Sequence, residues 1–297
     1  MSLPPGQVFP PGDVWLASYP KSGNTWMRIL LSNLLSGSES PEDINNLALH
    51  DGMACNRNQF EEQTLLDSSL LRPHEIEDLL PAVHDANVAT GTTARFVKVH
   101  DVWKCLPDGR PVLGRGARAA LYLVRDPQDV AISFAFHQAR TVDQVIERLN
   151  RPGYFLAGGQ FHFPQQLDDW SGHVRSWLDQ TVVRVHLIRY EDLRADTCGV
   201  FRRALEFLGA AFPDELAASN AVSRAVLHAD FSELRRQESA KGFRERGPEQ
   251  AMFFREGRSG AWREQLSNAQ IFQIESAHAA TMARLGYELV TKGEGMV

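Results

Sequence analysis

The chain has 297 residues, enough for one large α/β domain or two small ones. Hydrophobic residues make up 43% and charged residues 23% of the chain, which is an ordinary soluble balance. The net charge of −6 argues against a general nucleic-acid binder, because such proteins carry a basic domain. No apolar run approaches the length of about 18 residues that a membrane helix needs.

The charge is unevenly distributed along the chain. The segment from Glu39 to Asp85 contains eleven acidic and two basic residues, Arg57 and Arg72, a local charge of −9. The remaining scaffold, with 29 basic and 26 acidic residues, carries +3, which suits an anionic ligand. The cysteines at positions 55, 105 and 198 show no CxxC spacing, and residues 1–13 lack signal-peptide features. We therefore expect a reducing, cytoplasmic location and no metal site.

Short apolar runs alternate with helical repeats along the chain. The strand candidates are Asp13–Tyr19, Arg95–His100, Ala119–Val124 and Val182–Arg189. The helix candidates are Trp26–Leu35, Gln128–Gln138 (after Pro127), Gly199–Leu208 and Ser267–Leu285. This alternation predicts a three-layer α/β fold with a central, mostly parallel sheet, in which ligands bind beyond the carboxyl ends of the strands.

No repeat or low-complexity linker divides the chain, so we expect one domain over 1–297 with long insertions. The insertions are placed at about 36–94 and 140–166, where they would bind an acceptor. A third segment at about 235–260 is rich in Arg, Gly and Glu and predicts a mobile C-terminal lid loop.

Residues 19–26, YPKSGNTW, lie between the first strand and the first helix. The free N–H groups at a helix start bind anions, so Ser22, Gly23, Asn24 and Thr25 would cradle a phosphate, with Lys21 as an added donor. The loop is not a Walker A motif, because its lysine precedes the glycine. Taken alone, it could equally be an ordinary capped turn with a solvated lysine.

Three segments together resemble the signatures of the cytosolic-type sulfotransferases, which use 3′-phosphoadenosine 5′-phosphosulfate (PAPS) and release the bisphosphate PAP. YPKSGNTW resembles the family's PKSGTTW loop, YLVRDPQDVAISFAFH (122–137) its second signature, and FREGRSGAW (254–262) its RKGxxGDW motif. KVH (98–100) resembles the family's KTH. These matches occur in family order and imply a P-loop-like phosphosulfate-binding strand–loop–helix and a PAPS-dependent enzyme.

The resemblance assigns roles to the catalytic positions. Lys21 would stabilise the departing phosphate, and His100 would act as the general base on the acceptor hydroxyl. Lys98 would contact the sulfuryl oxygens. Arg125 and Ser133 would hold the 3′-phosphate, and Ser133 would also restrain the catalytic lysine. Without the resemblance, Arg125 would equally suit an ion pair with a neighbouring aspartate, Asp126 or Asp129.

The resemblance also implies a nucleotide pocket. Trp26 and Phe231 would stack on the adenine, and Tyr190 would reach its neighbourhood. Arg255 and Gly257 would close over the 3′-phosphate.

Several positions depart from the family pattern. Asn24 replaces the first threonine of the loop, and Glu256 replaces the lysine of RKG, where Arg258 would offset its charge. Ala261 and Ala229 replace a family aspartate and threonine. The family's KTVE-type dimer motif is not visible, so a homodimer is an open expectation only.

The expected acceptor is a small hydroxylated molecule bound across His100, with no nucleic-acid or membrane partner. The acidic first insertion would favour cationic or polar acceptors, although acidic runs are commonly solvated faces. SYPKSGNTW also resembles bacterial sulfotransferases that modify natural products such as glycopeptides. The alternatives are a P-loop-type small-molecule kinase and a non-catalytic module that binds PAP.

Overall fold

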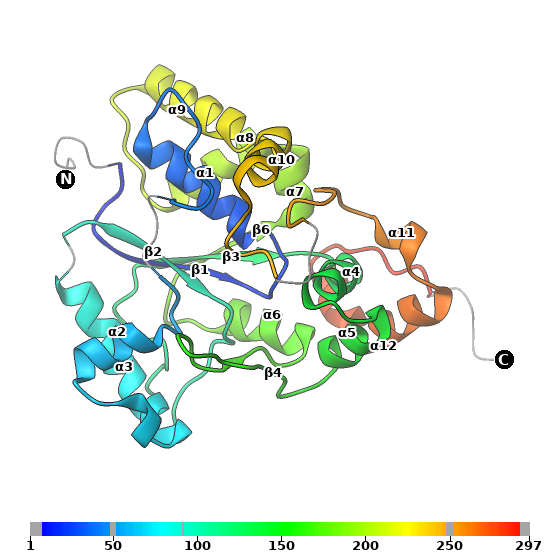
Figure 1. Cartoon of the computed structure of the whole chain (residues 1–297), viewed down its shortest axis with the longest axis horizontal. Helices are drawn as coiled ribbons and strands as arrows, with labels where there is room; N and C mark the ends of the chain where they lie inside the picture. The colour runs from blue at the N-terminus through cyan, green and yellow to red at the C-terminus, as the bar shows by residue number, and fades with distance from the viewer. Residues whose placement is uncertain (1–7, 48–51, 91, 248–251, 292–297) are drawn as a thin grey trace.

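A four-stranded parallel sheet forms the centre of the computed structural model, which describes residues 8–47, 52–90, 92–247 and 252–291 (Figure 1). The strand order is β2 (Ala94–Val99), β1 (Gly12–Ser18), β3 (Ala119–Val124) and β6 (Val185–Arg189). The predicted parallel α/β fold is therefore confirmed. Residues 1–7, and residues 48–51, 91 and 248–251 of the expected insertions and lid, lie outside the described residues.

Helices cover both faces of this sheet. They are α1 (Asn24–Ser36), α2 (Arg57–Thr64), α3 (Pro73–Thr90), α4 (Pro127–Gln138), α5 (Val142–Leu149), α6 (Trp170–Asp179), α7 (Tyr190–Ala195), α8 (Thr197–Phe207), α9 (Glu215–His228), α10 (Phe231–Lys241), α11 (Trp262–Gln265) and α12 (Asn268–Arg284). A short 3-10 helix, η1 (Ser68–Leu70), and an antiparallel pair, β4 (Phe155–Leu156) and β5 (Gln165–Gln166), complete the elements. Among the described residues, no helix has the length and apolar character to cross a membrane.

The alternation of side chains along β1 explains the three layers. Val14 and Leu16 pack on one face with α1, α8, α9 and α10. Trp15 and Ala17 pack on the other with α4, α5, α6 and α12. A strand buried on both faces reads as a continuous apolar run, as the sequence of β1 does. Each large side chain buried in this way contributes about 1.5–3 kcal/mol, so the strands are held firmly from both sides.

Most predicted boundaries are shifted by one or two residues, and two differ by more. Strand β6 begins at Val185 rather than Val182, whose side chain is 40% exposed. The expected lid loop at 235–260 starts within a helix, because α10 extends to Lys241. Asp230 caps that helix by accepting a hydrogen bond from the Ser232 backbone, and Leu234 is buried beneath it. Capping and a buried face therefore outweigh the polar composition of this segment.

The two expected acceptor insertions pack against each other at lower left in Figure 1. Cys55 and Phe60 from the first insertion share a small apolar cluster with Phe163 from the second. The Phe163 backbone N–H donates to the Cys55 carbonyl at 2.9 Å. Met53 bridges to Lys98 in parallel register, which joins the first insertion to the edge strand β2. The insertions therefore sit beside the carboxyl end of β2.

Candidate active site

The carboxyl ends of the four strands meet at one cavity of about 520 Å³. The β1–α1 loop, the residue after β2, the residue after β3 and the first residue of α7 all line it. The sequence-predicted residues on its wall are Lys21, Gly23, Asn24, Thr25, Trp26, Lys98, His100, Arg125, Ser133, Tyr190, Phe231, Arg255, Glu256 and Gly257. Ser22 differs, because its side chain is buried and does not line the cavity.

The β1–α1 loop is held in a backbone conformation that few residues adopt. Lys21 has φ 69° and Gly23 has φ 101°, both in the left-handed region. A Cβ atom at Gly23 would lie 2.9 Å from the ring of Tyr190, so this position has no room for a side chain. A non-glycine residue at positive φ is strained, and such strain gathers at ligand-binding sites. The loop is therefore shaped for close backbone approach of a ligand.

Asn24 uses its side chain to hold the protein rather than to face a ligand. Its Nδ2 donates to the Leu16 carbonyl at 2.7 Å and to Ser18 Oγ at 3.2 Å. The Asn24 side chain thus anchors the loop to β1, and the contribution of its backbone N–H to the phosphate cradle stays a prediction. In the part of the chain that the structure describes, Ser22 Oγ has no hydrogen-bond partner.

Lys21 presents its ammonium group to the cavity. Its Nζ lies 4.1 Å from the centroid of the Phe253 ring. Burial, together with the charges of Lys98 and Arg125, lowers the pKa of Lys21 to about 7. Because like charges repel, an anion bound beside these cations would favour the charged state of the lysine.

His100 is buried at the carboxyl end of β2, and its ring orientation is set by the backbone. Its Nδ1 lies 2.7 Å from the Ser18 carbonyl oxygen. Because a carbonyl only accepts, Nδ1 carries the proton and Nε2 keeps its lone pair. Burial and the charge of Lys98 lower the pKa of His100 well below its ordinary value. The imidazole is therefore neutral, as a general base must be before the reaction.

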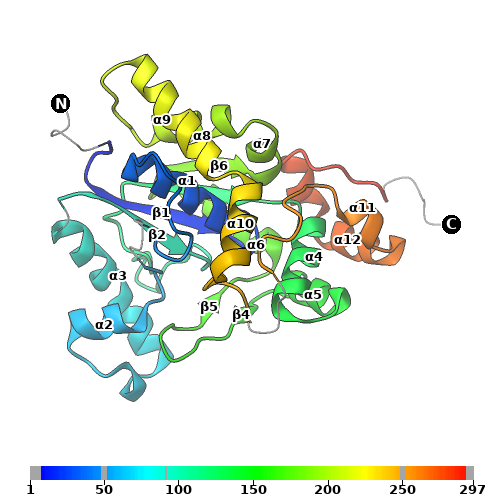
Figure 2. The ribbon, with the colours of Figure 1, turned by 45° about the horizontal axis from the view of Figure 1, so that its top comes forward.

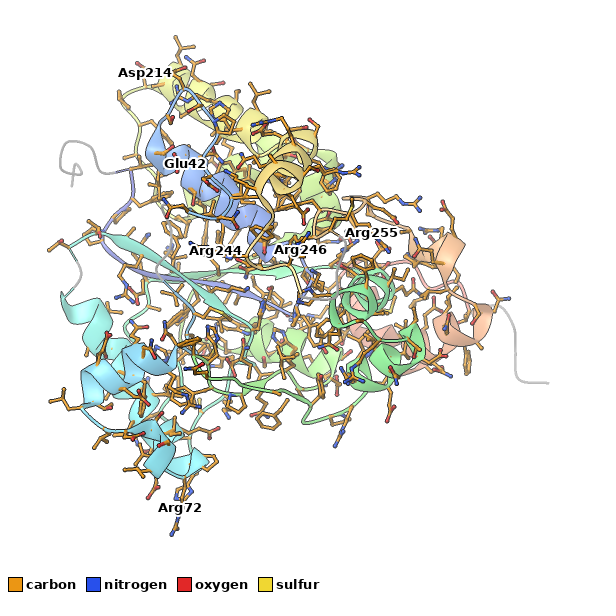
Figure 3. All side chains as sticks on the ribbon, in the orientation of Figure 1. Glu42, Arg72, Asp214, Arg244, Arg246 and Arg255 are labelled. Atoms are coloured by element: carbon orange, nitrogen blue, oxygen red, sulfur yellow. The ribbon has the colours of Figure 1, made fainter. Side chains whose placement is uncertain are left out.

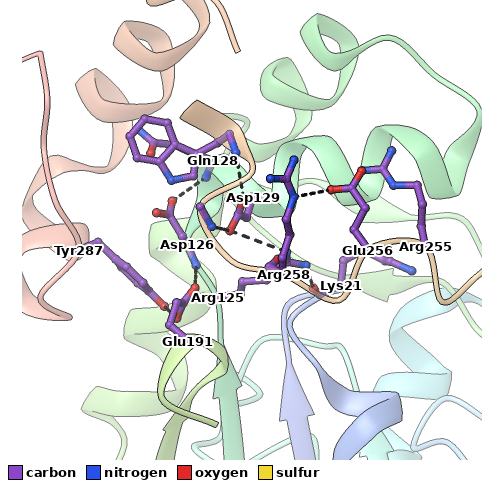
Figure 4. A network of polar contacts seen from close by, with 12 residues as sticks. Lys21, Arg125, Asp126, Gln128, Asp129, Glu191, Arg255, Glu256, Arg258 and Tyr287 are labelled. Atoms are coloured by element: carbon purple, nitrogen blue, oxygen red, sulfur yellow. Dashed lines mark hydrogen bonds and ion pairs between the residues drawn. The ribbon is translucent and has the colours of Figure 1, made fainter. Parts of the chain in front are cut away.

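Arg125 follows β3 and lies at the centre of the polar network in Figure 4. Its guanidinium donates to the carbonyl oxygens of Lys21 (3.4 Å) and Arg258 (3.0 Å) and lies 4.5 Å from the centroid of the Tyr190 ring. Asp129 is its ion-pair partner at 3.7 Å, the alternative that the sequence left open. In the described structure Arg125 Nε has no hydrogen-bond partner.

Asp129 has a positioning role that sequence reasoning missed. Its carboxylate accepts from the backbone N–H groups of Gly260 (2.7 Å) and Trp262 (3.1 Å). It thereby attaches the third signature to α4, which carries Ser133 on the cavity wall.

The third signature closes the cavity with paired charges (Figure 4). Glu256 pairs with Arg258 at 2.9 Å and with Arg255 at 3.3 Å, so its negative charge is offset as expected. A Cβ atom at Gly257 would lie 2.5 Å from the Phe231 ring, so only glycine fits against that ring without a shift. The loop and the aromatic wall are thus in direct contact.

Aromatic side chains form the other end of the cavity. Trp26 donates from Nε1 to the Ala229 carbonyl at 2.9 Å, and its ring lies 6.1 Å from the centroid of Tyr190. Phe231, the first residue of α10, lines the same cavity. This wall offers flat apolar faces of the kind on which nucleobases stack.

Glu245 and Arg28 were not singled out from the sequence. Arg28, on α1, is ion-paired with Glu245 at 2.5 Å, and Glu245 lines the cavity beside Lys98. Arg28 lies within an apolar helical repeat, and Glu245 in a loop of mixed charge, so neither position carried a pattern. The two residues are 217 positions apart in the chain, so only the folded structure brings them together.

A second cavity of about 720 Å³ lies within the insertions. Its described lining includes Cys55, Phe155 and Phe163, and it contains none of the predicted site residues. The acidic residues Glu61 and Glu77 of the first insertion face this cavity. The first insertion contributes Met53 to the cavity that holds His100. Its acidic residues Glu61 and Glu77 line the second cavity and not the candidate active site.

The protein has an α/β fold in which a buried, neutral histidine and a group of cations line one cavity. The family model described as the sulfotransferase domain matches residues 11–286. The chain belongs to the sulfotransferase family.

Curated relatives agree with this assignment. Cytosolic sulfotransferase 17 of Arabidopsis thaliana is 25% identical over 279 residues, covering 89% of this chain and 72% of the relative. The luciferin sulfotransferase of Photinus pyralis is 23% identical over 274 residues, covering 89% and 70%. The protein is thus similar along most of its length to enzymes that bear the sulfotransferase name.

Solved structures share the fold. Retinol dehydratase in complex with androsterone and PAP has a TM-score of 0.58 at 20% identity, covering 99% of this chain and 85% of that one. Mouse sulfotransferase SULT7A1 complexed with PAP has a TM-score of 0.54 at 17% identity, covering 91% and 84%. The central sheet with its helical layers is therefore the sulfotransferase fold.

Proposed function

We propose that this protein transfers the sulfuryl group of PAPS to a hydroxyl group of a small-molecule acceptor, with His100 as the general base. One observation carries the proposal. Residues of all three signature segments line a single cavity, with the neutral imidazole of His100 among the cations Lys21, Lys98 and Arg125.

The described residues fit the nucleotide. The side chains of Lys21, Thr25 and Arg125 line the cavity and carry the cationic and hydroxyl donors that phosphate oxygens accept from. Gly23 and Gly257 let the backbone pack directly against the rings of Tyr190 and Phe231, where a Cβ atom would collide. Trp26, Tyr190 and Phe231 would hold the adenine, and PAP is the ligand named for the related retinol dehydratase and mouse structures.

When bound, PAPS supplies an activated sulfuryl group on a phosphate leaving group. His100 takes the proton of the acceptor hydroxyl at Nε2, while the Ser18 carbonyl holds the protonated Nδ1 in place. Lys21 stabilises the charge that develops on the phosphate, because a fixed positive charge at that place favours the transition state. Lys98 holds the sulfuryl oxygens, and Arg125 and Ser133 hold the 3′-phosphate.

Part of the cavity wall is apolar. Met53, Ile132, Phe134, Leu156 and Phe253 line it. We therefore favour a hydroxylated acceptor with an apolar or aromatic body. Luciferin and androsterone, named for two of the related proteins, are molecules of this class.

The test combines nucleotide binding with transfer. PAP is expected to raise the melting temperature, whereas ATP with Mg²⁺ is expected to leave it unchanged, which separates the proposal from a kinase. Radiolabelled sulfate from PAPS is then followed onto a panel of phenols, steroids and polyhydroxylated compounds. Absence of PAP binding by the folded protein would refute the proposal, and PAP binding with no transfer to any acceptor would favour a non-catalytic module.

A further inference from the structure

The carboxylate of Glu245 reaches into the cationic side of the cavity. It accepts a hydrogen bond from Thr25 Oγ1 at 3.0 Å and pairs with Arg28 at 2.5 Å and with Lys98 Nζ at 3.5 Å. These three groups come from the first turn of α1, its second turn and strand β2. Glu245 itself comes from the segment after α10, so the contact joins two distant parts of the chain.

The partners of Glu245 are those expected for a bound oxyanion. A hydroxyl at the start of a helix, an ammonium and a guanidinium donate to two oxygens of one negative group. Burial would raise the pKa of Glu245, but the charges of Lys98 and Arg28 outweigh burial and hold that pKa well below its ordinary value. The carboxylate oxygens therefore stand in for the oxygens of a phosphate or sulfuryl group.

The backbone that precedes Glu245 is held in place. Asn45 Nδ2 donates to the Gly242 carbonyl at 3.0 Å, and Asn45 Oδ1 accepts from the Arg244 backbone N–H at 2.8 Å. Figure 2 shows α10 lying beside α1, and Figure 3 places Arg244 and Arg246, the neighbours of Glu245 in the chain, next to α1. This anchored backbone holds the Glu245 carboxylate beside the β1–α1 loop.

We infer that Glu245 is a built-in competitor of the nucleotide, which occupies the 5′ end of the donor site and must leave before a 5′-phosphate or phosphosulfate binds. This inference rests on the proposed function, because it takes the β1–α1 loop as the 5′ cradle. Two anions cannot share Thr25 and Lys98, since like charges at such distances repel. The measured affinity for the nucleotide is then lower than the intrinsic affinity, because only molecules in which the carboxylate has left the site can bind.

Isothermal titration with two nucleotides tests the inference. PAP carries a 5′-phosphate, whereas adenosine 3′-phosphate lacks one. Glu245→Gln should bind PAP about 10-fold more tightly than wild type, since a charged hydrogen-bonded contact no longer has to be broken. Adenosine 3′-phosphate should bind both proteins equally. Glu39→Gln is the matched control, because it also removes one carboxylate, from an exposed ion pair with Arg224.

The outcomes separate this inference from the proposed function. If neither wild type nor Glu245→Gln binds PAP, the proposed function fails. If wild type binds PAP and Glu245→Gln binds it equally or more weakly, Glu245 is not a competitor and the inference fails. Equal tightening for both nucleotides would also overturn it, because the effect would then be one of overall charge. Melting temperatures of all three proteins show that each is folded.

Discussion

Two parts of the chain form the candidate site: the carboxyl ends of the strands, called here the sheet edge, and residues 242–262, called here the covering segment. Different interactions hold the two parts in place. Lys98, His100 and Arg125 lie on or directly after strands buried on both faces, so their backbones are fixed by the core. The covering segment has no regular element until α11 among its described residues. Its position depends on Asn45, Asp129 and the contacts of Glu245.

This difference separates two kinds of function. Groups on the sheet edge keep their geometry whether or not a ligand is present, as electrostatic catalysis requires. The covering segment is anchored by buried side chains such as Phe254 and Trp262, whereas the polar contacts of Glu245 are of the kind that a bound anion can replace. Substitution of His100 or Lys21 should therefore change turnover most. Substitutions in the covering segment, and of Arg125, which donates to the Arg258 carbonyl of that segment, should change nucleotide affinity.

The largest effect is expected at His100. His100→Ala removes the general base and should lower kcat by about 10²–10⁴-fold. The affinity for PAP should stay within about two-fold of wild type, because the imidazole takes no part in nucleotide binding. Steady-state rates and titration calorimetry measure the two quantities. His74→Ala, at an exposed position of α3, is the control. A large loss of PAP binding would contradict the assignment of His100 as the base.

The charge state of Lys21 should determine how kcat/KM for PAPS depends on pH. Its pKa of about 7 lies below the ordinary value, so the free enzyme loses the ammonium charge as pH rises through 7. The value of kcat/KM for PAPS should therefore fall above pH 7, and Lys21→Arg should move this fall to higher pH because a guanidinium stays protonated. Lys21→Met should lower kcat by about 10²–10³-fold. An unchanged pH profile in Lys21→Arg would show that another group titrates.

Arg125 should affect binding more than chemistry. Arg125→Ala should lower the affinity for PAP by about 10–100-fold, since the substitution removes charge-assisted hydrogen bonds to phosphate. At saturating PAPS, kcat should change by less than about five-fold, within the spread of an indirect effect. Arg110→Ala, which removes an exposed guanidinium paired with Asp108, is the matched control. A loss confined to kcat would place Arg125 in the chemical step instead.

The smallest effect is expected in the covering segment at Gly257. Gly257→Ala and Gly242→Ala both place a side chain at positive φ, 60° and 73°, which costs about 1–3 kcal/mol of folding free energy in each variant. Only the first crowds Phe231, since a Cβ at Gly242 meets nothing within 4 Å. Gly257→Ala should therefore weaken PAP by about three- to ten-fold more than Gly242→Ala, as a partly lost stacking contact would. Equal PAP affinities of the two variants would show that Gly257 does not contribute to nucleotide binding.

The sequence by itself determined the elements and the family. Continuous apolar runs predicted strands buried on both faces, and β3 has the bounds that its run AALYLV predicted. The three signature segments identified the sulfotransferase family because each is a local pattern of consecutive residues. Most of the candidate site could be named in this way, since its residues follow strands directly and the carboxyl ends of parallel strands must meet.

Only the tertiary structure decided which side chains face the cavity and which partner each one has. Asn24 turned toward β1, Ser22 was buried, and Asp129 became the attachment of the third signature. Glu245 reached Arg28 and Thr25 across more than 200 residues of chain, although no local pattern marked it. The physical reason is that charge pairing depends on distance in space, and the packing of α10 beside α1 sets that distance, whereas strands and signature loops are encoded in neighbouring residues.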